Sequence, residues 1–178
     1  MINDMINEQQ SKAIISAILF KKQEGELKIF LQTRWKPKIS PTYSSMFEIP
    51  AGGIDPYENV YDALKREIKE ETNLDIVKII GDYHGDIVNP RKNDKAFVFK
   101  PFICQQALET NNGLPWIGFV FLCEVEGEVK VNKNEAKNPI WASIKDLKDI
   151  VENHHKNIFP LQLPVLKYFL ENIDNIDF

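Results

Sequence analysis

Apolar positions along the chain form short, β-prone runs separated by polar segments, and in a few places they take helical spacing instead. The runs Ala13 to Phe20 and Leu27 to Thr33 flank a polar segment that contains Gly25, which predicts an antiparallel hairpin. Helical spacing predicts helices over Ser143 to Asn153 and Leu161 to Glu171. Further strands are expected at Phe47 to Pro50, Asp75 to Val88, Ala96 to Cys104 and Trp116 to Val125. The chain is therefore expected to hold more strand than helix.

The clearest helical pattern runs from Asn59 to Thr72. Asn59 is a suitable N-cap, and Asn73 tolerates the left-handed conformation that closes a helix. A helical wheel at about 100° per residue places the apolar residues of this segment on one stripe, which should face the core. These residues are Val60, Ala63, Leu64 and Ile68.

Three carboxylates of the same helix lie on or beside that apolar stripe. Glu67, Glu70 and Glu71 stand at i, i+3 and i+4, so their oxygens are expected to come together. Burying unpaired carboxylates costs several kcal/mol, and a divalent cation would compensate them. Hard oxygen donors favour Mg²⁺ or Mn²⁺, whereas zinc would prefer His or Cys. The alternative is a solvated helix end in which the charges form i,i+4 ion pairs.

A longer motif surrounds these glutamates. Gly52, five residues, Glu58, seven residues and then the run Arg66 to Leu74 resemble the 23-residue Nudix box of pyrophosphohydrolases, which act on nucleoside diphosphates linked to another moiety. Every charged position of the pattern is filled, and the one departure is Asn73, where the family has Gly. The resemblance implies an α/β fold, the Nudix fold, with a mixed β-sheet sandwiched between α-helices.

The resemblance also implies roles for the box residues. The three helix glutamates and the Gly52 carbonyl would bind Mg²⁺ or Mn²⁺. Arg66 would orient box carboxylates, paired with Glu58, and would not touch the substrate. Independently of the family, water attack on a diphosphate requires neutralised phosphate charge and a nucleophile near neutral pH, and bound metal ions supply both.

Candidates for the base and for substrate binding lie outside the box. Glu135 stands in an Asn-rich loop six residues before Trp141, similar to the family's loop glutamate, although it could equally be an ordinary surface charge. Its rivals Glu124, Glu126 and Glu128 have strand spacing and favour a solvated face. Substrate candidates are Arg34, Lys36 and Arg91 for phosphate oxygens, and Trp35 or Trp116 for base stacking. The alternative for each of these five residues is an ordinary place on the surface or in the core, without contact to a substrate.

Three functions remain open at this stage. The segment Glu48 to Gly52 and Pro90 resemble the ADP-ribose pyrophosphatase branch, so ADP-ribose or a nucleotide sugar is the favoured substrate. The first alternative is a nucleoside triphosphate pyrophosphohydrolase that removes non-standard nucleotides. The second is a non-catalytic Nudix domain that senses a nucleotide. The branch resemblance also implies a possible homodimer.

Chain length, charge and the length of the apolar stretches limit the expected number of domains, the class of partner and the cellular location. A chain of 178 residues fits one Nudix hydrolase domain over residues 1–178. Twenty-two Lys and Arg against 26 Asp and Glu give a net charge of −4, which favours a small-molecule partner and no nucleic acid. Apolar stretches of eight residues, Ala13 to Phe20 and Trp116 to Cys123, are too short to cross a membrane. No secretory signal is recognised in residues 1–12, so a cytoplasmic location is expected, with Cys104 and Cys123 as buried hydrophobes.

Overall fold

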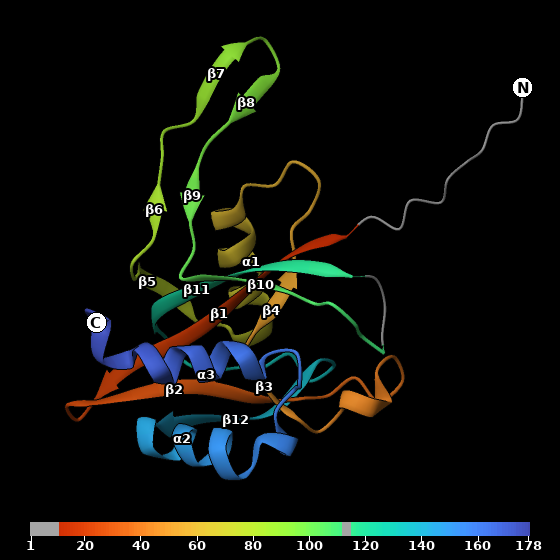
Figure 1. The fold of residues 1–178 in the computed structure, drawn as a ribbon, viewed down its shortest axis with the longest axis vertical. Helices are drawn as coiled ribbons and strands as arrows, with labels where there is room; N and C mark the ends of the chain where they lie inside the picture. Colours follow the sequence, from red (N-terminus) through yellow and green to blue (C-terminus); the bar gives the residue numbers. More distant parts are fainter. Residues whose placement is uncertain (1–10, 112–114) are drawn as a thin grey trace, which may run out of the picture.

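The computed structural model describes residues 11–111 and 115–178, and most of the segment on which the signal-peptide prediction rests lies outside this range. A mixed eight-stranded sheet forms the centre, with the path β10-β11-β1-β2-β12 (Figure 1). Its strands are β1 Lys12–Gln23, β2 Glu26–Arg34, β3 Phe47–Glu48, β4 Ala51–Gly53, β5 Asp75–Ile79, β10 Ile103–Gln106, β11 Trp116–Glu126 and β12 Ala136–Ser143. The α-helices are α1 Val60–Thr72, α2 Ile144–Asn153 and α3 Leu163–Asn172.

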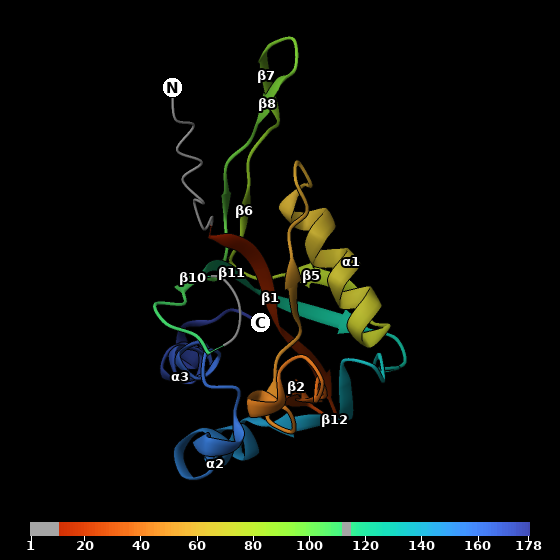
Figure 2. The same ribbon diagram turned by 90° about the vertical axis from the view of Figure 1, so that its right-hand side faces the viewer.

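The strand pairings make the sheet mixed. β1 pairs with β11 in parallel and with β2 and β4 antiparallel, so the predicted hairpin of β1 and β2 is confirmed. β3 pairs with β2, and β5 with β11, on the flanks of the main path. As Figure 2 shows, α1 covers one face of the sheet, while α2 and α3 lie on the other. The expected α/β architecture with a sheet between helices is therefore confirmed.

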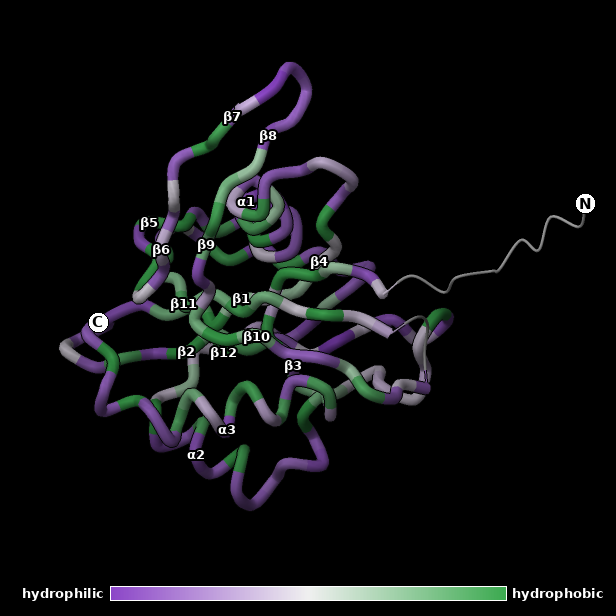
Figure 3. Tube along the Cα trace, turned by 45° about the horizontal axis from the view of Figure 1, so that its top comes forward, coloured by the Kyte–Doolittle hydropathy of each residue, from purple (hydrophilic) through white to green (hydrophobic). Residues whose placement is uncertain are grey.

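Strand alternation divides the core into two layers. Ile15, Ala17 and Leu19 of β1 are fully buried and pack with Leu64 and Ile68 of α1. The opposite face of the same strand contributes to the cluster that α2 and α3 cover, whose buried members include Ile18, Phe20, Leu147, Leu166 and Phe169. Figure 3 shows the apolar positions gathered along the central strands. Both faces of the sheet are buried, which accounts for the continuous apolar runs in its sequence.

Helix α1 begins and ends where its capping residues predict. The Asn59 side chain accepts a hydrogen bond from the Tyr61 backbone N–H at 2.9 Å. At the other end Asn73 adopts φ 63°, the left-handed conformation expected of a helix terminator, and its N–H donates to the Lys69 carbonyl. The strand β4 immediately precedes the loop to α1, so both parts of the box are fixed to the same region of the sheet.

The region between β5 and β10 differs from the prediction. A single strand from Asp75 to Val88 is wrong, because β5 ends at Ile79 and Gly81 turns the chain with φ +68°. The chain then forms a hairpin that projects from the sheet (Figure 1). The single strand predicted over Ala96 to Cys104 is also wrong, because part of this segment lies in the strands of the hairpin and its last residues begin β10 of the sheet. The strands of the hairpin are β6 Tyr83–His84, β7 Val88–Arg91, β8 Asp94–Ala96 and β9 Phe99–Lys100.

The edge strand β12 was not predicted. It pairs with β2, and its register shifts between Lys137 and Ile140, where Asn138 has φ 46° and Pro139 has no N–H to donate. Of the two cysteines, Cys123 is buried as expected, but the prediction for Cys104 is wrong because it is exposed on β10. Among the described residues, no helix is long and apolar enough to cross a membrane.

Candidate active site

A glycine of β4 allows a box carboxylate to lie directly against the backbone. Gly52 stands opposite Ile15 of β1 in the sheet. A Cβ atom added at Gly52 would lie only 1.9 Å from Cδ of Glu67. No side chain is therefore tolerated at position 52 while the Glu67 carboxylate keeps this place. The close approach brings the Gly52 backbone and a carboxylate of α1 together.

Arg66 links the loop to the helix. Its Nε donates to Oε1 of Glu58 at 2.8 Å, and its Nη2 donates to Oε2 of Glu58 at 2.8 Å. Nη1 donates to Oε1 of Glu67 at 2.6 Å, and Nη2 also donates to the Gly53 carbonyl at 3.1 Å. The Arg66 guanidinium lowers the pKa of Glu58 to about 2, with help from the Asp55 N–H. The predicted pairing of Arg66 with Glu58 is confirmed.

Glu71 is the most deeply buried carboxylate of the box. Its side chain accepts one hydrogen bond, at 2.9 Å, from Nε2 of Gln32 on β2. Burial and then the nearby Glu48 carboxylate raise the pKa of Glu71 to about 8. Glu48 is itself buried, and its burial raises its pKa although Arg34 donates to it at 2.9 Å. Two carboxylates therefore share a poorly solvated site.

Glu70 departs from the sequence expectation. Its side chain is 61% exposed and lies 3.8 Å from Nη1 of Arg66, so it does not belong to the buried face. Within residues 11–111 and 115–178, no three acidic, His or Cys side chains are grouped closely enough to hold a metal ion. The physical reason is that the box carboxylates have separate partners: Arg66 holds Glu67, and Gln32 holds Glu71.

The residues nevertheless fit a hard divalent cation in their chemistry. The available donors are carboxylate and carbonyl oxygens, the ligands that Mg²⁺ prefers. Glu71 and Glu48 are buried near each other, with one Arg and one Gln as their hydrogen-bonding partners. The absence of a side chain at Gly52 leaves the space that the Glu67 carboxylate occupies. A cation between Glu67 and Glu71 would lower the cost of keeping these charges in the fold.

A cavity of about 390 Å³ adjoins this part of the fold. Gly52 and Gly53 form part of its wall, and three of the five predicted substrate residues, Arg34, Lys36 and Trp116, line it as well. Arg34 is held in place by Glu48 and by Phe159, whose ring centroid is 5.1 Å from the guanidinium carbon. With Lys12, the cavity thus combines three cations and an indole beside the box, a set suited to a phosphorylated aromatic ligand.

Glu135 lies near the box as the sequence comparison implied. Its carboxylate is 2.7 Å from Nζ of Lys36, and its charge contributes to the raised pKa of Glu71. The loop that carries it is tied to the end of α1, because the Asn132 N–H donates to the Glu71 carbonyl at 3.0 Å. Trp35 lies outside the cavity, in a neighbouring groove that contains Glu135. The structure therefore brings the loop glutamate to the helix carboxylates.

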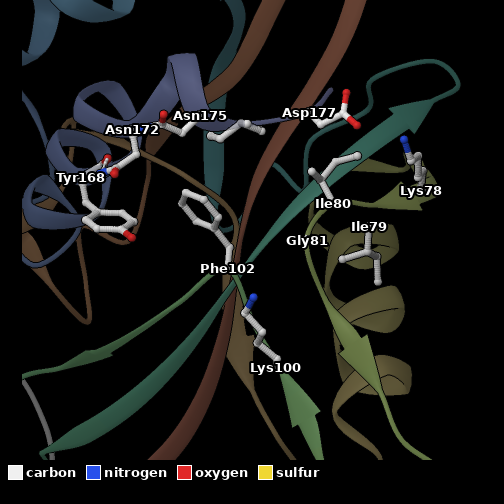
Figure 4. A pocket seen from close by; sticks show the side chains of 11 residues that line it. Lys78, Ile79, Ile80, Gly81, Lys100, Phe102, Tyr168, Asn172, Asn175 and Asp177 are labelled. Atoms are coloured by element: carbon white, nitrogen blue, oxygen red, sulfur yellow. Dashed lines mark hydrogen bonds between the residues drawn. The ribbon is translucent and has the colours of Figure 1, made fainter.

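Arg91 is not brought to the site. It lies at the end of β7 in the projecting hairpin, far from α1 and β4 along the molecule (Figure 1), because the strand predicted in this region is replaced by that hairpin. A larger cavity of about 640 Å³ also lies elsewhere, lined by Lys78, Lys100, Phe102 and Tyr168 among others (Figure 4). No box residue lines that larger cavity.

Two polar residues of the site were not predicted as functional. Gln32 and Glu48 are register partners in the β2–β3 pair, and both are buried beside Glu71. Gln32 directly follows the apolar run Ile29 to Leu31, and Glu48 directly precedes the Ile-Pro-Ala-Gly-Gly segment. A polar residue directly after a buried apolar run was the available signal, since a polar residue that is buried with the run needs a partner inside the fold.

Comparison with known proteins finds relatives in sequence and in fold. The RNA pyrophosphohydrolase of Campylobacter jejuni subsp. jejuni strain 81-176 is 28% identical over 176 residues, which cover 94% of this chain and 97% of that protein. A NUDIX family hydrolase from Clostridium perfringens has a TM-score of 0.60 at 21% identity, covering 93% of this chain and 97% of the other. The NUDIX domain of Shewanella oneidensis NrtR, complexed with ADP ribose, has a TM-score of 0.59 at 12% identity, covering 92% and 89%. These two structures share the fold.

The sequence model of the family described as NUDIX domain matches residues 11–162. The match includes the central sheet, α1, the Glu135 loop and α2, so it covers every element that positions the candidate site. Together with the Arg66 network at Gly52, it shows that the chain belongs to the NUDIX family of pyrophosphohydrolases.

Proposed function

We propose that this protein hydrolyses the diphosphate bond of a nucleotide derivative with the help of Mg²⁺ or Mn²⁺. The observation that carries the proposal is the position of the Glu67 carboxylate, held by Arg66 against Gly52 at the wall of a cavity that Arg34 and Lys36 line. Buried Glu71 completes the acidic side of this arrangement. A structural charge network would need neither a side-chain-free glycine nor cations in an adjoining cavity.

Each group has a defined part in this chemistry. A bound divalent cation, held by Glu67, Glu71, the Gly52 carbonyl and Glu70 after a rotamer change, would neutralise phosphate charge and acidify the attacking water. Arg66 and Glu58 fix the orientation of Glu67. Arg34 and Lys36 would bind phosphate oxygens from inside the cavity.

Glu135 is our proposed general base. Its carboxylate would accept the proton of the attacking water, and its ion pair with Lys36 at 2.7 Å keeps it at the cavity edge. A phosphate bound at Lys36 would compete for this ammonium and free the carboxylate. The hydrogen bond from the Asn132 N–H to the Glu71 carbonyl anchors this loop to the end of α1 and keeps Glu135 close to the proposed cation ligands.

The site specifies the reaction more closely than it specifies the substrate. ADP-ribose was favoured by the Glu48 to Gly52 segment and Pro90, but Pro90 lies in the projecting hairpin, away from the cavity. The relatives named RNA pyrophosphohydrolase favour instead a 5′-phosphorylated RNA end. We therefore propose a panel of ADP-ribose, a nucleotide sugar, non-standard nucleoside triphosphates and 5′-triphosphorylated RNA, each assayed with Mg²⁺ and with Mn²⁺. Product identification shows which bond is cut.

Substitution of Glu71 tests the proposed chemistry. Glu71→Gln keeps the shape of the side chain but removes a metal ligand, so we expect kcat to fall by about two orders of magnitude or more with the fold intact. Glu70→Gln is expected to act in the same direction. The matched control is Glu128→Gln, an exposed glutamate paired only with Lys130, which should retain full turnover. Wild-type turnover of Glu71→Gln, with circular dichroism unchanged, would refute the proposal.

The panel also separates the other hypotheses. Much faster cleavage of nucleoside triphosphates than of every other substrate would support the nucleotide-cleansing function. Tight nucleotide binding without hydrolysis at either metal would support a sensor and contradict our proposal. Association into a homodimer, which the ADP-ribose branch implies, is read separately by light scattering.

A further inference from the structure

The cavity of about 640 Å³ lies apart from the box, and no residue of the candidate active site lines it. Its walls come from three segments: the end of β5 with the turn after it, the chain that leaves the hairpin, and the end of α3 with the residues that follow (Figure 4). Cavities of this volume commonly hold small organic ligands. This cavity is therefore large enough for a ligand of its own.

Two aromatic rings give the cavity an apolar wall. The ring centroids of Phe102 and Tyr168 are 5.6 Å apart with an angle of 63° between the planes. Phe102 also packs edge-on against the buried ring of Phe169, which holds it in place. Tyr168 is nevertheless 38% exposed. A held but exposed ring offers a surface on which a flat ligand can pack without much ordering of the protein.

A lysine without an acidic partner extends into the cavity beside this wall. Lys100 ends the hairpin strand β9, and its side chain lies next to Phe102 in Figure 4. Within the part of the chain that the structure describes, its ammonium forms neither an ion pair nor a hydrogen bond. An ammonium in this position favours a phosphate or carboxylate group of a ligand.

An oriented amide stands on the other side of the rings. Nδ2 of Asn172 donates to the Tyr168 carbonyl at 2.8 Å, which fixes the side chain and leaves Oδ1 as a hydrogen-bond acceptor. Lys78 and Asp177 lie at the end of the cavity opposite Tyr168 (Figure 4), and they form no ion pair with each other. The cavity thus combines a free cation, an aromatic wall and separate polar groups.

We propose that this cavity binds a nucleoside phosphate at a site separate from the box. The base would pack on Tyr168 and Phe102, with its exocyclic amino group donating to Oδ1 of Asn172. The phosphates would bind Lys100, and the ribose hydroxyls would donate to Asp177. The inference goes beyond the proposed function and does not depend on it, because no group of the box takes part.

Calorimetric titration with ADP in the presence of EDTA tests the proposal, because chelation removes metal-dependent binding at the box. We expect saturable binding that Lys100→Ala weakens about tenfold through loss of the charge-assisted bond. Tyr168→Leu should weaken binding as well, whereas Tyr168→Phe, which keeps the ring, should retain most of it. Inorganic phosphate that binds as tightly as ADP, or ADP binding that Lys100→Ala leaves unchanged, would overturn the proposal.

Two lysine variants are the matched controls. Lys95→Ala removes the same charge from an exposed position on β8 outside the cavity, and should bind ADP like the wild type. Lys36→Ala removes a cation from the cavity beside the box, and should also keep ADP binding in EDTA. If Lys95→Ala weakens binding as much as Lys100→Ala, the effect is one of general charge and the proposal is wrong. It is equally wrong if Lys36→Ala abolishes binding, since ADP then occupies the candidate active site.

Photolabelling locates the ligand and separates this inference from the proposed function. With 2-azido-ADP in EDTA, we expect labelled peptides from α3 or from the segment around Phe102, and label confined to the box or β2 would refute the site. Lys100→Ala should hydrolyse the substrate found in the panel at the wild-type rate. Hydrolysis by a wild-type protein that binds no ADP in EDTA would refute this site and keep the function. ADP binding that Lys100→Ala weakens, without hydrolysis of any panel substrate, would do the reverse.

Discussion

At the scale of single residues, one amide orients the most buried carboxylate of the box. Gln32 is fully buried on β2, and its Nε2 donates to Oε2 of Glu71 at 2.9 Å. Its Oε1 has no hydrogen-bond partner in the structure. Because this donor is a neutral amide, it orients the Glu71 carboxylate without neutralising its charge. Residues of this kind typically tune metal affinity through the ligand that they hold.

Gln32→Leu is expected to weaken the response to metal more than the fold. Loss of the donor should raise the Mg²⁺ concentration for half-maximal activity about tenfold or more. Stability should change little, because leucine also removes an unpaired buried oxygen at similar volume. Magnesium titrations of activity and of Tm measure both effects. The control is Gln106→Leu, an exposed glutamine of β10. An unchanged magnesium requirement for Gln32→Leu would show that Gln32 does not position Glu71.

The roles of single residues were predictable where spacing alone determines them. The box fixes the distance between Glu58 and Arg66 along the chain, and their ion pair follows from it. Gln32 and Glu48 are different, because they meet Glu71 only after β3 pairs with β2 and α1 covers the sheet. The exposure of Glu70 was also missed, because a helical wheel gives the direction of a side chain but not how far the neighbouring elements extend over it.

At the scale of elements, the end of α1 depends on the residue that departs from the family pattern. Asn73 adopts φ 63°, and its Nδ2 donates to the Glu128 carbonyl at 2.9 Å. Asn73→Ala should destabilise the protein by about 1–2 kcal/mol, because alanine tolerates the left-handed region poorly and cannot donate. Urea unfolding measures this change, and kcat of the folded protein should stay at the wild-type level.

Asn73→Gly serves as the control for that experiment. Glycine restores the family residue and accepts positive φ, so only the hydrogen bond to Glu128 is lost and the cost should be smaller than for alanine. Equal destabilisation by Ala and Gly would mean that the hydrogen bond, and not the backbone conformation, determines the stability of this helix end.

Elements were predictable from sequence where local signals define them. α1 has an N-cap, an apolar stripe and a left-handed terminator, and its limits were found within a residue. β12 lacked such signals, because Asn138 and Pro139 interrupt it and its pairing with β2 is a tertiary event. The division of the Asp75 to Val88 segment is marked by Gly81, but the apolar residues around it are as compatible with a continuous strand as with a projecting hairpin.

At the scale of the whole molecule, the buried Glu71 couples stability to pH and to metal. Its pKa of about 8 in the fold lies well above the ordinary value of 4.5. The fold therefore favours the protonated carboxyl, and this contribution is fully present below pH 4.5 and is lost as pH rises through about 8. For the metal-free protein we expect Tm to fall by about 5–10 °C between pH 5 and pH 8 from this group.

Magnesium should reverse this trend, because a cation stabilises the ionised form that burial disfavours. The rise in Tm on adding saturating MgCl₂ is therefore expected to be larger at pH 8 than at pH 5.5. Differential scanning calorimetry at both pH values, with and without EDTA, measures it. Glu71→Gln removes the titrating group, so its Tm should vary less with pH and its magnesium response should no longer depend on pH. If Glu71→Gln keeps the wild-type pH dependence, other groups that titrate in this range control the stability, and the buried carboxylate is not the group that couples the fold to its metal.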